Sequence, residues 1–313
     1  MRRITRRDFV ATTVGAAVVA APRAVAGVQG PRAMSRWPSE FPALGQTVNG
    51  HELVYHVEGT GPLLIVWPGG AGMGWEYMRM PEVEKHTALL YVEPVGTGAS
   101  GRLPPSGYTL AGDVADLEAL RVALGLDRVS LLGHSYGGAV VLSYAIARPG
   151  RLAKLILLDT APTFGSDWQD DVDANMAGFA AEPWFADAMA ANDITTSTAE
   201  EWLGQFRRQA GFYFFDYTSH KTDYDALFAK VRFWMDAGRR MQSPYDVRAQ
   251  LSTVKVPTLI VVGVRDAICS PKFARQMNES IVGSKLIVLE HSGHLGHVEE
   301  PRVLAAALDA FIP

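Results

Sequence analysis

Two kinds of hydrophobic pattern alternate along the chain from about residue 46 onward. Continuous apolar runs predict strands that are buried on both faces, and runs with apolar positions at helical spacing, such as 110–124, predict helices between them. The predicted strands are 63–67, 88–92, 129–132, 155–158, 258–262 and 285–289, and further helices are predicted over 139–147, from 271 and from 301. This alternation predicts an α/β fold, a doubly wound and mostly parallel sheet covered by helices on both faces.

A turn signal precedes these runs. Asn49-Gly50 stands between two strand-like segments, of which the second is 52–58. Asn-Gly is the dipeptide that best fits a two-residue hairpin turn, because both residues tolerate a positive φ. We therefore predict an antiparallel hairpin at the start of the sheet.

The alternation stops between Thr163 and about Ser252. This stretch has no convincing strand pattern and is rich in aromatic residues, which favours a mostly helical insertion, or cap, over the strand ends. The predicted division is thus a first core part over 27–162, a cap over 163–252 and a second core part over 253–313. A cap above a site lines part of its pocket. The aromatic residues predicted to line the pocket are Trp67, Trp184, Phe214 and Phe215.

The first 26 residues have the pattern of an export signal. Arginines come first, an apolar stretch over 9–21 follows, and Ala24-Val25-Ala26 forms a cleavage signal. The segment Thr5-Arg6-Arg7-Asp8-Phe9-Val10 resembles the twin-arginine signal. We predict export to the periplasm or the medium after removal of 1–26, with no integral membrane segment left. The alternative is an uncleaved anchor, although the apolar stretch is shorter than the roughly 20 residues that span a bilayer.

Composition and charge narrow the class of protein. The 313 residues are 48% hydrophobic and 20% charged, as in an ordinary globular protein. Without residues 1–26 the formal charge is −8, which argues against nucleic acid or anionic membranes as partners. Cys269 is the single cysteine, so an internal disulfide is impossible. No metal-ligand cluster, phosphate loop or nucleotide fingerprint occurs, so we predict no cofactor and no metal.

The segment 129–138 carries the main chemical signal. A strand-like run ends in Gly133-His134-Ser135-Tyr136-Gly137, and a helical pattern follows at once. A G-x-S-x-G sequence between strand and helix predicts a nucleophile elbow, a tight turn that presents the serine at its tip. Glycine is required two residues before and after Ser135, because the turn leaves no room for side chains there.

Two later strand ends supply the partners that a serine nucleophile needs. A hydroxyl becomes reactive when a base, usually an imidazole oriented by a carboxylate, takes its proton. Asp266 follows the strand 258–262, while His291, His294 and His297 follow the strand 285–289. In parallel sheets the site lies at the carboxyl ends of the strands, and the order serine, acid, histidine is the one expected on such a sheet.

From these residues the chain is identified as a member of the α/β-hydrolase superfamily over residues 46–313. The segment 113–138 resembles its helix, strand and nucleophile, and Ser292-Gly293-His294 resembles its histidine loop. The resemblance implies that His294 is the base, with His291 and His297 as loop-packing or surface residues. It implies Asp266 as the acid, with Asp159 as the alternative, since some members take the acid from the strand before it.

The resemblance also implies the position of the oxyanion hole. One donor is the N–H of Tyr136, and the second is the N–H of Gly70 in Pro68-Gly69-Gly70-Ala71-Gly72. Here the chain departs from the usual pattern, in which a histidine precedes the paired glycines. Pro68 occupies that place, after Trp67.

Within the superfamily the chain looks most like the prolyl iminopeptidase-like group. The loop 69–72, the segment Gly96-Thr97-Gly98-Ala99-Ser100 and the helical cap carry this resemblance. Together with the export signal, it implies an exported serine hydrolase that cleaves an amide or ester bond of a small substrate, either an ester or a short peptide. A peptidase of this kind needs cap carboxylates for the substrate amine. The candidates are Asp187, Glu200, Glu201 and Asp216.

Two alternatives stay open. A carboxylesterase or lactonase would need no free amine on its substrate. A member of another class would be a non-hydrolytic ligand-binding protein or a perhydrolase that has kept the three residues.

Overall fold

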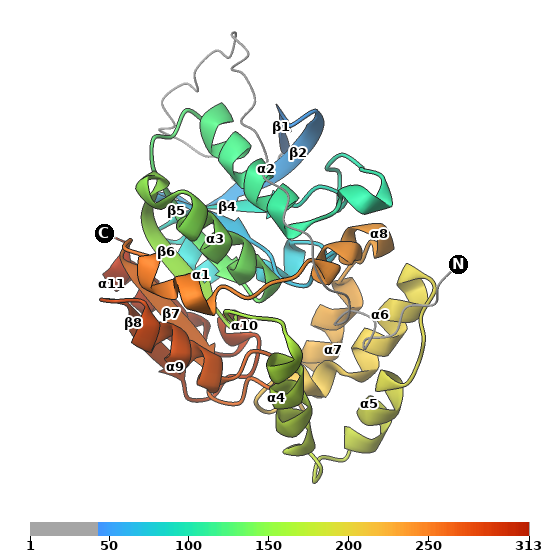
Figure 1. The fold of residues 1–313 in the computed structure, drawn as a ribbon. Coiled ribbons are helices and arrows are strands. Elements are labelled where there is room, and N and C mark those ends of the chain that lie inside the picture. The colour runs from blue at the N-terminus through green and yellow to red at the C-terminus, as the bar shows by residue number, and fades with distance from the viewer. Residues whose placement is uncertain (1–42, 313) are drawn as a thin grey trace.

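The computed structural model describes residues 43–312, and the predicted export signal lies outside this range. One eight-stranded sheet runs through the molecule in the order β1-β2-β4-β3-β5-β6-β7-β8 (Figure 1). Strands β3 to β8 are parallel, and β2 pairs antiparallel with both β1 and β4. The bounds are β1 Leu44–Val48, β2 His51–Glu58, β3 Leu63–Trp67, β4 Ala88–Glu93, β5 Val129–His134, β6 Leu152–Leu158, β7 Thr258–Gly263 and β8 Lys285–Leu289. The predicted α/β fold with a mostly parallel sheet is confirmed.

The predicted hairpin joins β1 and β2. Asn49 and Gly50 both have positive φ, 47° and 86°, as a two-residue turn of this kind requires. Val48 pairs with His51 across the turn, so the register follows directly from the turn length.

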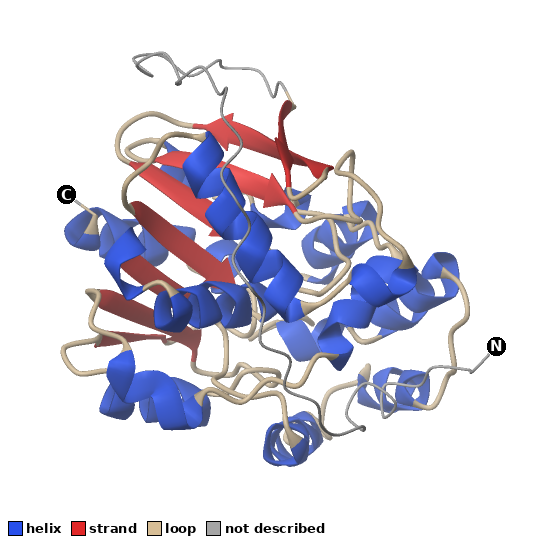
Figure 2. Cartoon of the chain, turned by 45° about the horizontal axis from the view of Figure 1, so that its top comes forward, coloured by secondary structure: helices blue, strands red, loops and turns tan. Residues whose placement is uncertain are grey.

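Helices cover both faces of the sheet, as Figure 2 shows. Because side chains alternate along a strand, Leu64 and Val66 enter one hydrophobic core while Ile65 and Trp67 enter the other. The core that holds Trp67 is formed with α2 (Leu110–Ala123), α3 (Tyr136–Ala147) and part of α9 (Pro271–Ser280). The opposite core is formed with α1 (Pro81–Glu84), the long α11 (Pro301–Phe311) and the cap; the short α10 (Gly296–Glu299) precedes α11.

Between β6 and β7 the chain forms helices and turns. Figure 1 shows α5, α6 and α7 grouped at one end of the molecule, away from the β1–β2 hairpin. The helices of this segment are α4 Ser166–Ala177, α5 Phe185–Asn192, α6 Ala199–Arg208, α7 Lys221–Lys230 and α8 Met235–Gly238, with 3-10 turns η5 Ala210–Tyr213, η6 Arg239–Gln242 and η7 Arg248–Thr253. Within residues 43–312, no helix has the length and apolar character needed to cross a membrane.

Candidate active site

Ser135 occupies the tip of a strained turn between β5 and α3. Its φ of 53° and ψ of −122° lie in a region that a residue with a side chain rarely adopts, a strain that surrounding structure must hold in place. The Ser135 N–H bonds to the carbonyl of Leu158 at 3.0 Å. A Cβ atom on Gly133 would collide with the backbone of Gly137, and one on Gly137 would collide with the carbonyl oxygen of Trp67. The turn therefore has the close packing that the glycine spacing predicts.

His294 and Asp266 meet from the loops after β8 and β7. Nδ1 of His294 lies 2.9 Å from Oδ2 and 3.0 Å from Oδ1 of Asp266. The carboxylate is held in turn by the N–H groups of Ile268 and Cys269, each 2.8 Å from Oδ1. Burial lowers the pKa of His294, but the charge of Asp266 and its hydrogen bond outweigh that effect, so the pKa is raised overall.

Asp159, the alternative acid, is buried beside this pair, and its carboxylate is hydrogen-bonded to backbone N–H groups. Its two oxygens accept hydrogen bonds from the N–H groups of Gly263, at 2.9 Å, and Gly296, at 3.3 Å. Burial, followed by the nearby charge of Asp266, raises the pKa of Asp159. The structure thus places Asp266, rather than Asp159, against the imidazole.

His291 and His297, the other two histidines that follow β8, have different surroundings. His291 is exposed and its ring packs edge-on to Phe215 at 5.6 Å. His297 is buried, and its Nε2 lies 2.9 Å from the carbonyl oxygen of Tyr77. Neither side chain lines the cavity that holds Ser135.

Ser135 and His294 both open into one cavity of about 750 Å³ between the sheet and the cap. Most of its wall is aromatic, aliphatic or methionine. Its main apolar lining residues are Met73, Tyr77, Phe164, Trp168, Val172, Met176, Met189, Trp202, Phe206, Tyr213, Leu227, Phe228, Val231, Phe233, Met241, Ile268 and Leu295. Pockets with apolar walls and a few placed polar groups are typical of small-molecule sites.

None of the four aromatic residues predicted to line this pocket is among its lining residues, so this prediction is wrong. Trp67 has 0% of its surface exposed and packs in the core beneath α2 and α3, because the alternation of β3 directs it to that face. Trp184 packs edge-on against Phe212 at 5.1 Å, inside the cap.

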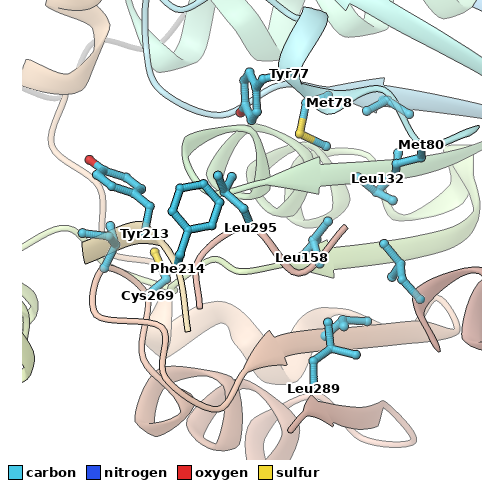
Figure 3. Close-up of a cluster of buried hydrophobic side chains, with 14 of the residues drawn as sticks. Tyr77, Met78, Met80, Leu132, Leu158, Tyr213, Phe214, Cys269, Leu289 and Leu295 are labelled. Atoms are coloured by element: carbon cyan, nitrogen blue, oxygen red, sulfur yellow. The ribbon is translucent and has the colours of Figure 1, made fainter. Parts of the chain in front are cut away.

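Phe214 and Phe215 do not line the cavity either. Phe214 stacks on Tyr224 with ring centroids 3.7 Å apart, and Phe215 packs on His291. Their neighbour Tyr213 does line the cavity, and its carbonyl oxygen accepts the N–H of His294 at 2.9 Å. Figure 3 shows Tyr213 and Phe214 in the same group of side chains as Leu295.

The candidate cap carboxylates do not line the cavity either. Asp187 is paired with Arg208 at 2.6 Å, and Glu201 closes the capping box of α6 with Thr198. Asp216 accepts the N–H of Ser219, while Glu200 is exposed. The carboxylates that do line it are Asp173 and Asp193, which are both exposed.

Gly70 and Tyr136, the predicted oxyanion donors, both line the cavity beside Ser135. Tyr136 begins α3, so its N–H has no carbonyl of the same helix to bond. Gly70 has a φ of 58°, and its carbonyl oxygen accepts the N–H of Met73 at 2.6 Å. This tight turn is what the glycine at position 70 permits.

The chain belongs to the α/β hydrolase family, whose model matches residues 62–301. It is 28% identical to a 2-hydroxy-6-oxo-2,4-heptadienoate hydrolase of Pseudomonas putida, over 84% of this chain and 93% of that protein. It is 25% identical to a proline iminopeptidase of Saccharolobus solfataricus, over 85% of this chain and 89% of that protein. An α/β fold family hydrolase of Bacillus anthracis superposes with a TM-score of 0.71 at 22% identity, covering 87% of this chain and 99% of that one. The family model and these relatives support a hydrolase.

Proposed function

We propose that this hydrolase cleaves carboxylic esters of small apolar acids through Ser135, His294 and Asp266. The observation that carries the proposal is the shared cavity. A serine on a strained elbow and an imidazole bonded to a buried carboxylate open into the same apolar space.

In the proposed reaction, Ser135 Oγ attacks the substrate carbonyl while Nε2 of His294 takes the hydroxyl proton. The N–H groups of Tyr136 and Gly70 stabilise the oxyanion, a contribution commonly worth ~2.7–4 kcal/mol per donor. Collapse expels the alcohol, which receives the proton from His294 and leaves an acyl-enzyme. Water then attacks the acyl carbon while His294 takes its proton. Collapse breaks the bond to Ser135 Oγ, which receives that proton from His294, and the free acid leaves.

The wall of the cavity supports an ester with an apolar acyl group. Its aromatic and methionine side chains offer contact area and few charges. The two carboxylates of its lining, Asp173 and Asp193, are exposed rather than buried among these side chains. A charged amine bound in the apolar part would lose its water without an ion-pair partner, which is costly.

The similarity to proline iminopeptidases supports a second candidate, an N-terminal prolyl amide as substrate. On that reading Asp173 or Asp193 at the cavity would bind the free amine. Replacing both by asparagine would then raise KM for the amide and leave an uncharged ester unaffected.

The two candidates are separated by comparing a nitrophenyl butyrate with a proline nitroanilide on the purified protein. We expect a higher kcat/KM on the ester, loss of that turnover in Ser135→Ala, and labelling of Ser135 by a fluorophosphonate. Faster cleavage of the anilide would favour the peptidase. Undiminished turnover by Ser135→Ala would remove both candidates, and binding without turnover by the wild type would favour the non-hydrolytic alternative.

We further propose that residues 1–26 direct export by the twin-arginine route. The arginine pair at Arg6 and Arg7, the apolar stretch and the Ala24-Val25-Ala26 site support this. Replacing both arginines by lysine should retain the protein in the cytoplasm. A mature protein that still begins before Gly27 would argue for the uncleaved anchor.

A further inference from the structure

A chain of three hydrogen bonds connects the loop of the oxyanion hole to the loop of the histidine base. The N–H of Gly69 donates to the hydroxyl oxygen of Tyr77 at 2.7 Å. The same hydroxyl lies 2.9 Å from Nδ1 of His134. Nε2 of His134 lies 2.9 Å from the carbonyl oxygen of His294. Gly69 adjoins the proposed donor Gly70, and His134 adjoins Ser135.

The direction of each bond in this chain follows from its ends. A carbonyl oxygen only accepts, so Nε2 of His134 carries the proton. Burial, together with the neighbouring His294 and His297, lowers the pKa of His134 well below its usual value, so the ring stays neutral. Nδ1 is then an acceptor, and the Tyr77 hydroxyl must donate to it. The hydroxyl oxygen is left free to accept the N–H of Gly69.

Close packing also holds Gly69, Tyr77 and His134 in place. A Cβ atom on Gly69 would lie 2.7 Å from Nδ1 of His134 and 2.7 Å from Cβ of Ser135, nearer than real side chains approach. The loop backbone thus rests directly on the elbow. Tyr77 has 8% of its surface exposed and His134 has 2%, so water cannot easily replace either partner.

We propose that Tyr77 and His134 are positioning residues that hold the oxyanion-hole loop and the histidine loop in register around Ser135. The proposal rests on the proposed serine hydrolase function and deepens it. Catalytic groups must keep their relative positions closely, since a displacement of about 1 Å can cost about 100-fold in rate. Each end of the chain of hydrogen bonds is a backbone group, so side-chain identity at positions 69 and 294 does not carry the coupling.

The first test is Tyr77→Phe, which keeps the ring in the cavity and removes the hydroxyl. We expect kcat on a nitrophenyl ester to fall by about 10- to 100-fold, with KM within about twofold, because the loss concerns transition-state geometry. Affinity for a boronic acid that mimics the tetrahedral state should fall by a similar factor, while affinity for the product acid should not change. A kcat within twofold of the wild type would overturn the proposal.

Tyr245→Phe is the matched control. Tyr245 is also a buried tyrosine whose hydroxyl bonds to a backbone carbonyl, that of Ala161 at 3.2 Å, and it does not line the cavity. Loss of the Tyr245 hydroxyl should lower the melting temperature without a comparable loss of kcat. Equal losses of kcat in the two variants would mean that Tyr77 acts only through stability.

Two replacements of His134 test the other end. His134→Gln keeps an N–H donor that can reach the carbonyl of His294, whereas His134→Leu has none. We expect the glutamine variant to retain at least tenfold more kcat than the leucine variant. Equal activities would count against the proposed role of this bond.

Nuclear magnetic resonance tests these hydrogen bonds directly, independently of whether the protein cleaves an ester. The ¹⁵N shifts of His134 should show a neutral ring protonated at Nε2, and amide exchange of Gly69 should be slow and should accelerate in Tyr77→Phe. An Nδ1-protonated ring or unchanged exchange would overturn the connection between the loops. If the wild type cleaves no ester while both signals are as expected, the proposed substrate fails and the connection stands.

Discussion

The hydroxyl of Tyr136 donates a hydrogen bond to Oδ2 of Asp113 at 2.9 Å. The other carboxylate oxygen lies 3.4 Å from the guanidinium of Arg240, a side chain of the cap segment that is 1% exposed. Arg240 also donates to the carbonyl of Val95, in the loop after β4. Burial raises the pKa of Asp113 to about 6, although Arg240 and Tyr136 act in the opposite direction. This buried network thus connects the cap with the residue that follows the proposed nucleophile.

Removing the hydroxyl in Tyr136→Phe should destabilise the protein. Asp113 would stay buried with one donor fewer, and an unsatisfied buried polar group costs about 1–3 kcal/mol. We expect a loss of that size in the free energy of unfolding, measured by urea titration, together with a lower kcat.

Tyr144→Phe, on the same helix, serves as the control. Its hydroxyl bonds to Oε2 of Glu118 at 2.6 Å, away from the cavity. This variant should keep the wild-type kcat. A stability of Tyr136→Phe equal to that of the wild type would show that the network does not need this bond.

The acid can be identified by comparing two isosteric variants. Asp266→Asn removes the charge that orients and stabilises the protonated imidazole of His294, so kcat should fall by about 10⁴-fold, as for a triad acid. Asp159→Asn should cost far less, since the carboxyl of Asp159 bonds backbone N–H groups and its raised pKa already favours the neutral form. Steady-state kinetics on one ester measures both losses. A larger loss of kcat in Asp159→Asn than in Asp266→Asn would identify Asp159, which follows β6, as the acid.

Activity should rise with pH through the pKa of His294. The imidazole must be neutral to accept the serine proton, and its raised pKa places the midpoint of kcat/KM above the usual value of about 6.5. The neighbouring His134 and His297 have lowered pKa values and stay neutral over this range.

Glu299 is the group to control for in this experiment. Burial raises its pKa to about 7, and its Oε2 accepts the N–H of Gly293 at 2.6 Å, next to His294. A Glu299→Gln variant should keep the midpoint. If the midpoint disappears in that variant, the titration belongs to Glu299, and a midpoint below 6.5 would contradict the raised pKa of His294.

Sequence patterns predicted the strands and the positions of Ser135, Asp266 and His294, because apolar runs and strand ends are local features. The cavity wall was not predictable in this way. Tyr213 and Phe214 are adjacent aromatic residues, and only the packing of the cap decides that Tyr213 faces the cavity. Tyr77 likewise has no distinguishing spacing, since its partners Gly69 and His134 come from the loop after β3 and from the end of β5.

The glycines of the elbow offer the sharpest test of the local geometry. Gly137→Ala should unfold or strongly destabilise the protein, because the added methyl group would meet the carbonyl oxygen of Trp67 in the neighbouring strand, and a backbone atom cannot move aside. Gly204→Ala is the contrasting change, since Gly204 lies inside α6 and an added Cβ would point into open space. There the methyl group should stabilise the helix by about 0.5–1 kcal/mol. Thermal unfolding of both variants measures the difference, and a Gly137→Ala protein as stable as the wild type would show that β3 and the elbow are not packed as closely as described.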